Sequence, residues 1–246
     1  MARGFLRYLQ ASVPDTEVPL PGLLPTPRRP QPFLFTPAQI TALVEGAHAS
    51  RPRGALRPHT LSCLLGLLAS TGLRVGEAIH LQIDQVKLDL DPPQLHIRET
   101  KFHKSRIVPL HPSTAERLRQ YRAQRVHGHY DALSEAFFVP ERGQHLQHRA
   151  LHDWFTRLCQ RLALHPTAGG RTPCLSSFRH TFAVTRMQRW YEQGLDVQAL
   201  LPHLSVYLGH VHPQGSYWYL TAVPELLSAA ANRFQRYAQA GGPDHA

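Results

Sequence analysis

Apolar residues recur at helical spacing over most of the chain. Residues 58–71 are apolar nearly all round, which predicts a helix at the centre of the core that ends at Gly72. Before it, Thr36 and Pro37 have the character of an N-cap and a first helical position, so they predict a helix that continues to about His48. The pattern predicts further helices over residues 112–126, 147–163, 176–193, 196–201 and 223–238, and a short helix or turn over 216–220.

Three short runs with strand character follow the central helix, at residues 81–86, 94–99 and 105–110. The sequence Asp-Pro-Pro at residues 91–93 predicts a turn between the first two strands, and residues 101–104 predict a turn between the second and the third. Runs this close in the chain form a small antiparallel sheet most easily. The predicted fold class is therefore mainly α (α+β), with one three-stranded antiparallel sheet.

Proline marks a boundary near the N-terminus. Residues 11–35 contain seven prolines, which excludes regular secondary structure and predicts a linker. Residues 4–10 have the pattern of the last turns of a helix. We therefore expect a compact domain over residues 36–238 and a flexible tail over residues 239–246.

The charge of the chain favours a polyanionic partner. Lys and Arg number 27 against 17 Asp and Glu, a net charge of +10. Nucleic acid is the first candidate, although a GC-rich genome that encodes arginine freely would give the same composition. The only lysines are Lys87, Lys101 and Lys104. A lysine kept among arginines indicates a position that needs an amine able to lose its proton, unless the difference arose by chance.

Composition also argues against membrane, metal and disulfide chemistry. No apolar run approaches the ~20 residues that span a bilayer, and the N-terminus lacks the apolar stretch of a secretory signal. The cysteines, at positions 63, 159 and 174, are too few and too scattered for a disulfide framework or a zinc site. The 17 histidines form no recognised metal pattern. We therefore expect a cytoplasmic protein without a membrane segment, metal or other cofactor.

Arg74 follows the predicted central helix directly, within the sequence Thr-Gly-Leu-Arg-Val-Gly-Glu-Ala at residues 71–78. Glu77 comes three residues later, close enough on a helix to hold the guanidinium group in place. A fixed, planar and permanently charged guanidinium suits two oxygens of one phosphate. The alternative is a surface ion pair with no further role.

Three other segments concentrate polar chemistry. Residues 100–106 (Thr-Lys-Phe-His-Lys-Ser-Arg) lie at a predicted hairpin turn that either reaches into a DNA groove or is merely solvated. Residues 176–183 (Ser-Ser-Phe-Arg-His-Thr-Phe-Ala) begin a predicted helix, with Ser176 as N-cap and Arg179 in the first turn, where backbone N–H groups also favour an anion. Residues 208–220 contain a histidine after a glycine and then three aromatic residues, which alone would indicate a helix C-cap and core aromatics.

Together, the four segments resemble the tyrosine recombinase (phage integrase) family over residues 36–237. Their order matches the family's first arginine box (71–78), β-hairpin lysine box (100–110), second arginine box (176–183) and His-to-Tyr box (208–220). Tyr219 follows His210 by nine residues, the spacing that the family uses. The residues in these boxes are most similar to those of recombinases carried by transposons.

The resemblance implies a helical DNA breaking-rejoining fold and a set of site residues. It assigns the nucleophile to Tyr219 rather than to Tyr217, phosphate binding to Arg74 and Arg179, the general acid to Lys101, and a phosphate-contacting donor to His210. Lys104 and Arg106, on the basic hairpin, are expected to bind DNA. The implied activity is site-specific cleavage and rejoining of double-stranded DNA through a covalent 3′-phosphotyrosine, for a mobile element. It needs no cofactor, and a homotetramer assembled on DNA is the implied active form.

The chain departs from the family in two places. Ser176 stands where the family has His or Lys, and a serine cannot take a proton from Tyr219 at neutral pH. His180 adjoins Arg179 but on a helix points about 100° away from it. We therefore expect reduced activity, which Ser176→His should raise. The second departure is length: only residues 1–10, as a remnant of the family's N-terminal core-binding domain, precede the linker, so we expect weak, salt-sensitive DNA binding.

Three functions remain open on these grounds. The first is an active recombinase. The second is a truncated, catalytically weak remnant that only binds DNA. The third is a type IB topoisomerase, which the wording of the boxes disfavours.

Overall fold

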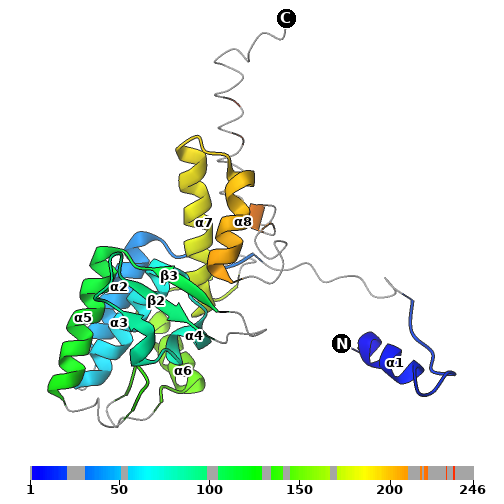
Figure 1. The fold of residues 1–246 in the computed structure, drawn as a ribbon, viewed down its shortest axis with the longest axis horizontal. Coiled ribbons are helices and arrows are strands. Elements are labelled where there is room, and N and C mark those ends of the chain that lie inside the picture. The colour runs from blue at the N-terminus through cyan, green and yellow to red at the C-terminus, as the bar shows by residue number, and fades with distance from the viewer. Residues whose placement is uncertain are drawn as a thin grey trace, which may run out of the picture. The chain divides into compact units, whose positions relative to one another are not determined.

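The computed structural model describes residues 2–20, 31–50, 55–98, 105–128, 134–140, 145–166, 171–209, 217, 219, 220, 231 and 235. The chain divides into two units, residues 1–30 and 31–246. The first unit contains helix α1, Ala2–Gln10, where the sequence predicted the end of a helix. All other elements belong to the second unit (Figure 1).

Helix α3, Leu56–Thr71, is the centre of the main hydrophobic core. Leucines on several of its faces are fully buried, because α3 packs against helices on more than one side. These neighbours are α2 (Pro37–His48), α5 (Pro112–His127) and α7 (Ser176–Glu192), and α2 also packs on α6 (His148–Arg161). The predicted central helix is confirmed.

Helix α2 begins where its capping residues predict. The Oγ1 of Thr36 accepts a hydrogen bond from the N–H of Gln39 at 3.2 Å, and the side chain of Gln39 accepts one from the N–H of Thr36 at 2.9 Å. This reciprocal pair is a capping box, and it satisfies two backbone donors that the first helical turn leaves open. Pro37 occupies the first helical position, as predicted.

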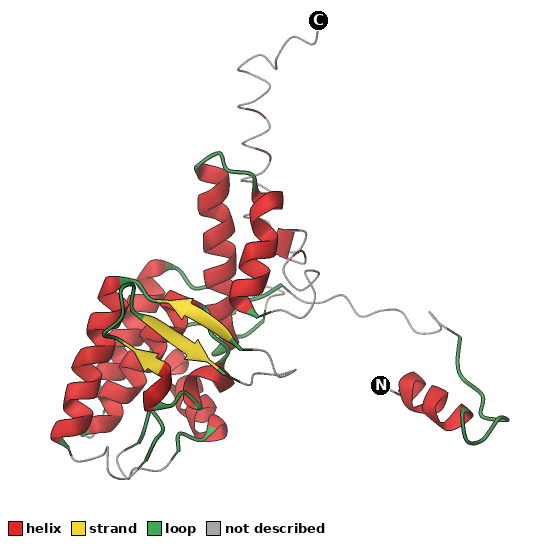
Figure 2. Ribbon diagram, viewed as in Figure 1, coloured by secondary structure: helices red, strands yellow, loops and turns green. Residues whose placement is uncertain are grey.

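The three strands form one antiparallel sheet in the order β1-β2-β3. They are β1 (Val86–Lys87), β2 (Gln94–Ile97) and β3 (Arg106–Pro109), and Figure 2 shows the sheet within a unit otherwise built from helices. Leu95 of β2 lies opposite Val108 of β3, and both side chains are fully buried. The predicted fold class and sheet are confirmed. The predicted turn at residues 101–104 lies outside the described residues.

The first strand is shorter than predicted. Residues 81–85 do not pair with β2. Instead, the carbonyl of Leu81 accepts a hydrogen bond from the N–H of Phe137, and the N–H of Ile83 donates to the carbonyl of Glu135. Residues Ile83–Gln85 then form a 3-10 turn, η1, so strand β1 starts only at Val86.

Helices α7 and α8 lie side by side and carry a second hydrophobic cluster (Figure 1). Helix α8, Val197–Leu208, was predicted to end at residue 201, before Pro202. It continues because Leu201, Leu204 and Leu208 are buried at helical spacing, so tertiary packing outweighs the helix-breaking tendency of the proline. Residues 217, 219 and 220 are helical, whereas most of the predicted helix 223–238 and the tail 239–246 lie outside the described residues.

Two further features differ from the predictions. A short helix, α4 (Val75–Ile79), directly follows Arg74 and was not predicted. The predicted linker over residues 11–35 also extends too far, since Phe33 and Phe35 are buried in the main core. The ring of Phe35 lies 4.8 Å from that of Phe178, and the backbone N–H of Phe35 donates to Oγ1 of Thr181 at 2.9 Å.

No helix of the described residues is long and apolar enough to cross a bilayer.

Candidate active site

Gly72 turns the chain sharply at the end of α3. Its φ of 63° is left-handed, and a Cβ at this position would lie 2.6 Å from Cδ1 of Phe182. Glycine is therefore needed both for the backbone conformation and for the close approach of α7. The turn places Arg74 at the start of α4, where the Oε2 of Glu77 accepts a hydrogen bond from its backbone N–H at 3.0 Å.

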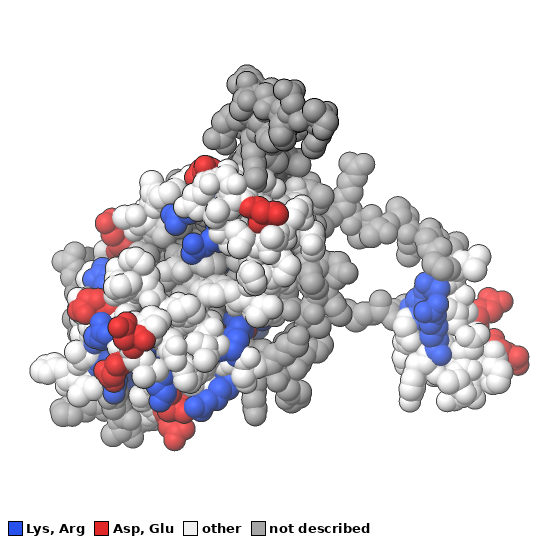
Figure 3. Space-filling view, turned by 45° about the horizontal axis from the view of Figure 1, so that its top comes forward, with Lys and Arg blue, Asp and Glu red and all other residues white. Residues whose placement is uncertain are grey.

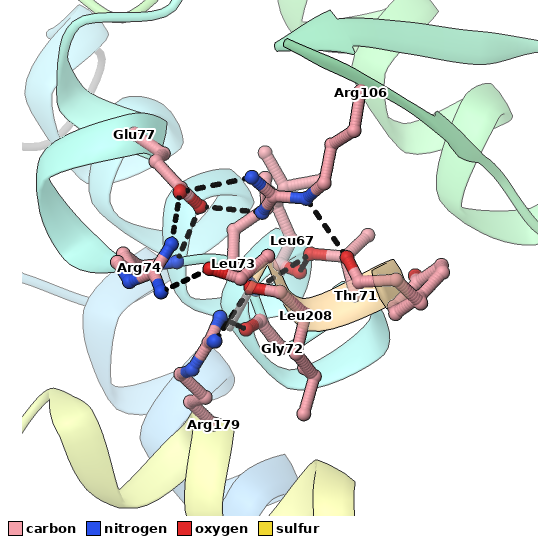
Figure 4. Close-up of polar contacts among 11 residues, drawn as sticks. Leu67, Thr71, Gly72, Leu73, Arg74, Glu77, Arg106, Arg179 and Leu208 are labelled. Carbon is pink, nitrogen blue, oxygen red and sulfur yellow. Dashed lines mark hydrogen bonds and ion pairs between the residues drawn. The ribbon is translucent and has the colours of Figure 1, made fainter. Parts of the chain in front are cut away.

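The carboxylate of Glu77 lies between two guanidinium groups (Figure 4). Its Oε1 accepts from Nη1 of Arg74 at 2.8 Å and from Nη1 of Arg106 at 3.0 Å, and its Oε2 accepts from Nη2 of Arg106 at 2.7 Å. Burial by itself would raise the pKa of Glu77, but the hydrogen bonds and the charge of Arg106, together with the hydrogen bonds from Arg74, outweigh it and hold the pKa below its ordinary value. Glu77 is therefore a charged carboxylate that fixes both arginines.

Three consecutive carbonyls at the end of α8 each accept a hydrogen bond from a different arginine. The carbonyl of Tyr207 accepts from Nε of Arg106 at 2.8 Å, that of Leu208 from Nη2 of Arg179 at 2.6 Å, and that of Gly209 from Nη2 of Arg74 at 2.6 Å. The last carbonyls of a helix have no partners within it and form the negative end of its dipole, so they attract cations. The C-terminal end of α8 thus gathers guanidinium groups from β3, α7 and the start of α4.

Arg179 is the most deeply buried of the three arginines. Its Nη1 donates to the carbonyl of Gly72 at 2.9 Å, so it joins the ends of α3 and α8. Burial lowers its pKa to about 10, and the charge of Arg74 acts in the same direction, while electrostatic interactions with Glu77 and then Tyr219 oppose it. A buried cation that crowds against another cation favours the arrival of an anion between them.

Tyr219 lies at hydrogen-bond distance from a histidine of α7. Its side chain is 3% exposed and belongs to the second hydrophobic cluster. Its hydroxyl oxygen is 2.7 Å from Nδ1 of His180, and the two ring centroids are 5.6 Å apart. Tyr217, two residues earlier, is 41% exposed.

The model of the phage integrase family matches residues 34–224. The chain belongs to this family. It is 41% identical over 239 residues to y4rB of Sinorhizobium fredii, which is named as an integrase/recombinase, and the match covers 95% of this chain and 76% of that protein. Other relatives are named tyrosine recombinase.

Solved structures of recombinases share the fold of this integrase family member. The structure of XerA recombinase covers 97% of this chain and 74% of its own length with a TM-score of 0.61 and 22% identity. The Tn1549 transposon integrase, solved with circular intermediate DNA, covers 95% of this chain and 77% of its own length with a TM-score of 0.63 and 15% identity. At these identities the likeness shows the fold, which is that of the tyrosine recombinase catalytic domain.

The structure brings part of the predicted integrase site together. Arg74 and Arg179 converge on the end of α8, and the predicted contact between Arg74 and Glu77 is confirmed. Lys101, Lys104 and His210 lie outside the described residues. In the sequence, His210 directly follows Gly209, whose carbonyl binds Arg74.

Arg106 was predicted to bind DNA from an exposed hairpin, but the structure shows that its side chain is largely buried rather than exposed. Its side chain is 10% exposed, and its guanidinium group is engaged by Glu77 and by the carbonyl of Tyr207. A strand alternates its two faces, so Arg106 lies on the same side of β3 as the buried Val108, whereas Ile107 between them is exposed. This alternation is the signal in the sequence that could have placed Arg106 inside.

Two details of the second arginine box also differ. Ser176 is not the N-cap of α7 but its first helical residue, after Leu175, and it is exposed. The hydroxyl of the next residue, Ser177, accepts the N–H of Cys174 at 3.1 Å and so closes the turn that starts the helix. His180, which points away from Arg179 as the helical geometry predicted, contacts the hydroxyl of Tyr219.

The described residues offer no site for a metal ion, since no three His, Cys, Asp or Glu side chains among them gather as ligands would. The chemistry that the geometry supports is anion binding beside a phenol.

Proposed function

We propose that this chain is a site-specific DNA recombinase that cuts and rejoins strands through a covalent 3′-phosphotyrosine at Tyr219, in the service of a mobile element. One observation carries the proposal. Three guanidinium groups meet at the end of α8, and among the described residues the only carboxylate that they contact is that of Glu77. The cluster therefore has a surplus of positive charge where a phosphate would bind, near the hydroxyl of Tyr219.

The surplus matters because a phosphodiester resists attack. Its oxygens are negative, and negative charge grows as the pentacoordinate transition state forms. Arg74 and Arg179 bind the non-bridging oxygens, and each preorganised donor of this kind contributes about 3 kcal/mol to the transition state. Arg106 and Glu77 hold Arg74 in place, so little of that energy is lost to ordering its side chain.

The leaving group needs a proton, and we assign it to Lys101. An amine can release a proton to the departing 5′ oxygen, whereas a guanidinium group cannot. His210 donates a hydrogen bond to the same phosphate. No cofactor is required, since the phosphotyrosine bond conserves the energy of the phosphodiester for the attack of a 5′-hydroxyl from another strand.

The partner in this proposal is double-stranded DNA, and the active form is a homotetramer assembled on it. The solved complex of the Tn1549 integrase with DNA, which shares the fold, supports DNA as the partner. On the face drawn in Figure 3, acidic and basic side chains of residues 31–246 are interspersed rather than segregated, so the arginine cluster, rather than net charge, indicates where DNA binds. The cytoplasm remains the predicted location.

A nicked duplex tests the proposal, because cleavage near a nick releases a short strand and traps the covalent complex. The duplex is built from DNA that flanks the gene. We expect a covalent adduct with the wild-type chain and none with Tyr219→Phe. Tyr217→Phe is the matched control, since it removes a phenol two residues away and should leave the adduct. An adduct that survives Tyr219→Phe would refute the assignment of the nucleophile.

The same assay separates the alternative functions. DNA binding without any adduct would favour the catalytically weak remnant. Strand exchange between two duplexes distinguishes a recombinase from a topoisomerase, which would only relax supercoiled DNA.

A further inference from the structure

We propose that His180 is the catalytic base that takes the proton of Tyr219, in the role that the family resemblance assigns to the residue at position 176. The inference rests on the proposed function and adds a residue to it. It explains how a chain with serine at position 176 can activate its nucleophile.

The geometry of the pair fits proton transfer. The Nδ1 of His180 lies 2.7 Å from the hydroxyl oxygen of Tyr219, within the range of about 2.6–3.2 Å in which a base accepts a proton directly. The rings are inclined by 61°, edge to face rather than stacked. With the proton of the neutral imidazole on Nε2, Nδ1 is the acceptor and the phenol is the donor.

Helix α7 explains why His180 can take this role. Ser176 and His180 are four residues apart within Ser176–Glu192, so their side chains project from the same face of the helix, one turn apart. An imidazole at position 176 and one at position 180 would therefore face the same region. Ser176 is exposed, and a hydroxyl accepts no proton at neutral pH, whereas the imidazole of His180 already contacts the phenol.

The neighbouring residue on the helix stabilises the product of the transfer. Removal of the proton leaves a phenolate, and the charges of Tyr219 and Arg179 are close enough to interact. The guanidinium group of Arg179, held by the carbonyls of Gly72 and Leu208, stays in place while this charge develops. Adjacent residues of α7 thus supply a proton acceptor and a counter-charge.

The step balances in both directions. In cleavage, the proton of Tyr219 moves to Nδ1 of His180, the phenolic oxygen forms a bond to phosphorus, and the bond from phosphorus to the 5′ oxygen breaks as that oxygen gains a proton from Lys101. In rejoining, a 5′-hydroxyl gives its proton to the neutral amine of Lys101 and attacks phosphorus, the bond to the tyrosine oxygen breaks, and the protonated His180 returns its proton to Tyr219.

The first experiment replaces His180 by asparagine, whose amide can still form a hydrogen bond to the phenol but cannot take its proton. We expect adduct formation on the nicked duplex to slow by about 10²–10⁴-fold, with unchanged DNA affinity. His203→Asn, at an exposed histidine of α8, is the matched control and should keep the wild-type rate. An unchanged rate in His180→Asn would overturn the proposal, whereas a wild-type chain that forms no adduct would overturn the proposed function with it.

A modified leaving group distinguishes a base from an acid. When sulfur replaces the 5′ bridging oxygen, the leaving thiol has a pKa near ~8.5 and departs without a proton. This substrate should restore cleavage by Lys101→Ala but not by His180→Asn, since the phenol must still lose its proton. Full restoration of His180→Asn would show that His180 acts on the leaving group and would overturn its role as base.

A double variant tests whether the loss concerns the imidazole or the packing around it. Ser176→His in the His180→Asn background returns an imidazole to the same face of α7, and we expect it to recover at least tenfold in cleavage rate. No recovery, in a double variant whose DNA affinity and circular dichroism match the wild type, would overturn the claim that His180 acts in place of a residue at position 176.

Discussion

Replacement of Glu77 by glutamine should destabilise the fold far more than loss of an exposed ion pair of the same length. Its carboxylate receives four hydrogen bonds, and its side chain is 6% exposed. Removal of one partner of a buried ion pair costs about 3–5 kcal/mol, because it leaves uncompensated charge in a medium of low polarity. Two guanidinium groups lose their counter-charge here and then repel each other. Since glutamine keeps one acceptor oxygen, we expect a loss of about 3 kcal/mol.

The assay is urea unfolding followed by circular dichroism at neutral pH, with Asp84→Asn as the matched control. Asp84 contacts Arg98 at 2.7 Å, the distance that separates Glu77 from Arg106, but the side chains of that pair are 55% and 50% exposed. An exposed pair contributes about 0–1 kcal/mol. Equal losses of unfolding free energy in Glu77→Gln and Asp84→Asn would refute the reasoning that burial gives this carboxylate its importance.

The same pair of proteins gives a pH dependence with a definite sign. Although burial alone would raise the pKa of Glu77, the bonds from Arg106 and Arg74 lower it below the ordinary value of 4.5. A lowered pKa in the folded state contributes stability that is present above the unfolded value and is lost as the pH falls through the folded value. The difference in unfolding free energy between wild type and Glu77→Gln should therefore shrink below about pH 4.5. A difference that stays constant down to pH 3 would contradict a lowered pKa.

Two further predictions concern positions that frame the site and the domain boundary. In Gly209→Ala, a residue with a Cβ must adopt a φ of 68°, and that Cβ would lie 2.9 Å from Nη1 of Arg106. We expect the variant to lose about 1–3 kcal/mol of unfolding free energy in urea and to form the adduct more slowly. An alanine variant with the wild-type rate would show that this close approach does not matter. Phe35→Ala removes a buried ring that contacts Phe155 and Phe178, so it should cost about 3–5 kcal/mol, whereas a loss below about 1 kcal/mol would place residue 35 in a linker after all.

Much of the helical framework is predictable because its determinants are local. The apolar character of residues 58–71 indicates a buried helix. The start of α2 is set by two adjacent residues, Thr36 and Pro37. The errors arise where distant contacts decide. Helix α8 passes through Pro202 because its leucines pack against α7, and residues 31–35 join the core because Phe35 meets rings from α6 and α7.

The contacts of the site likewise include some that local sequence predicts and some that depend on distant residues. The pairing of Arg74 with Glu77 follows from a spacing of three residues, so the sequence predicts it. The role of Arg106 depends on which face of β3 turns toward the core, and its bond to Tyr207 links residues 101 positions apart. A basic residue next to an exposed turn is usually solvated, which is why the pattern favoured a contact with DNA.

His180 shows what a correct local argument leaves out. On a helix its side chain does point about 100° away from that of Arg179, and that rotation separates it from the phosphate-binding cluster. The same rotation directs it toward Tyr219, which is 39 residues later and whose position no local rule supplies. An attacking phenol must lose its proton while it stays within reach of the phosphorus, so the base that takes this proton and the cation that balances the phosphate approach from different directions. Adjacent residues of one helix diverge by about 100° and can supply both groups, so the divergence of His180 from Arg179 fits a part for His180 in the reaction.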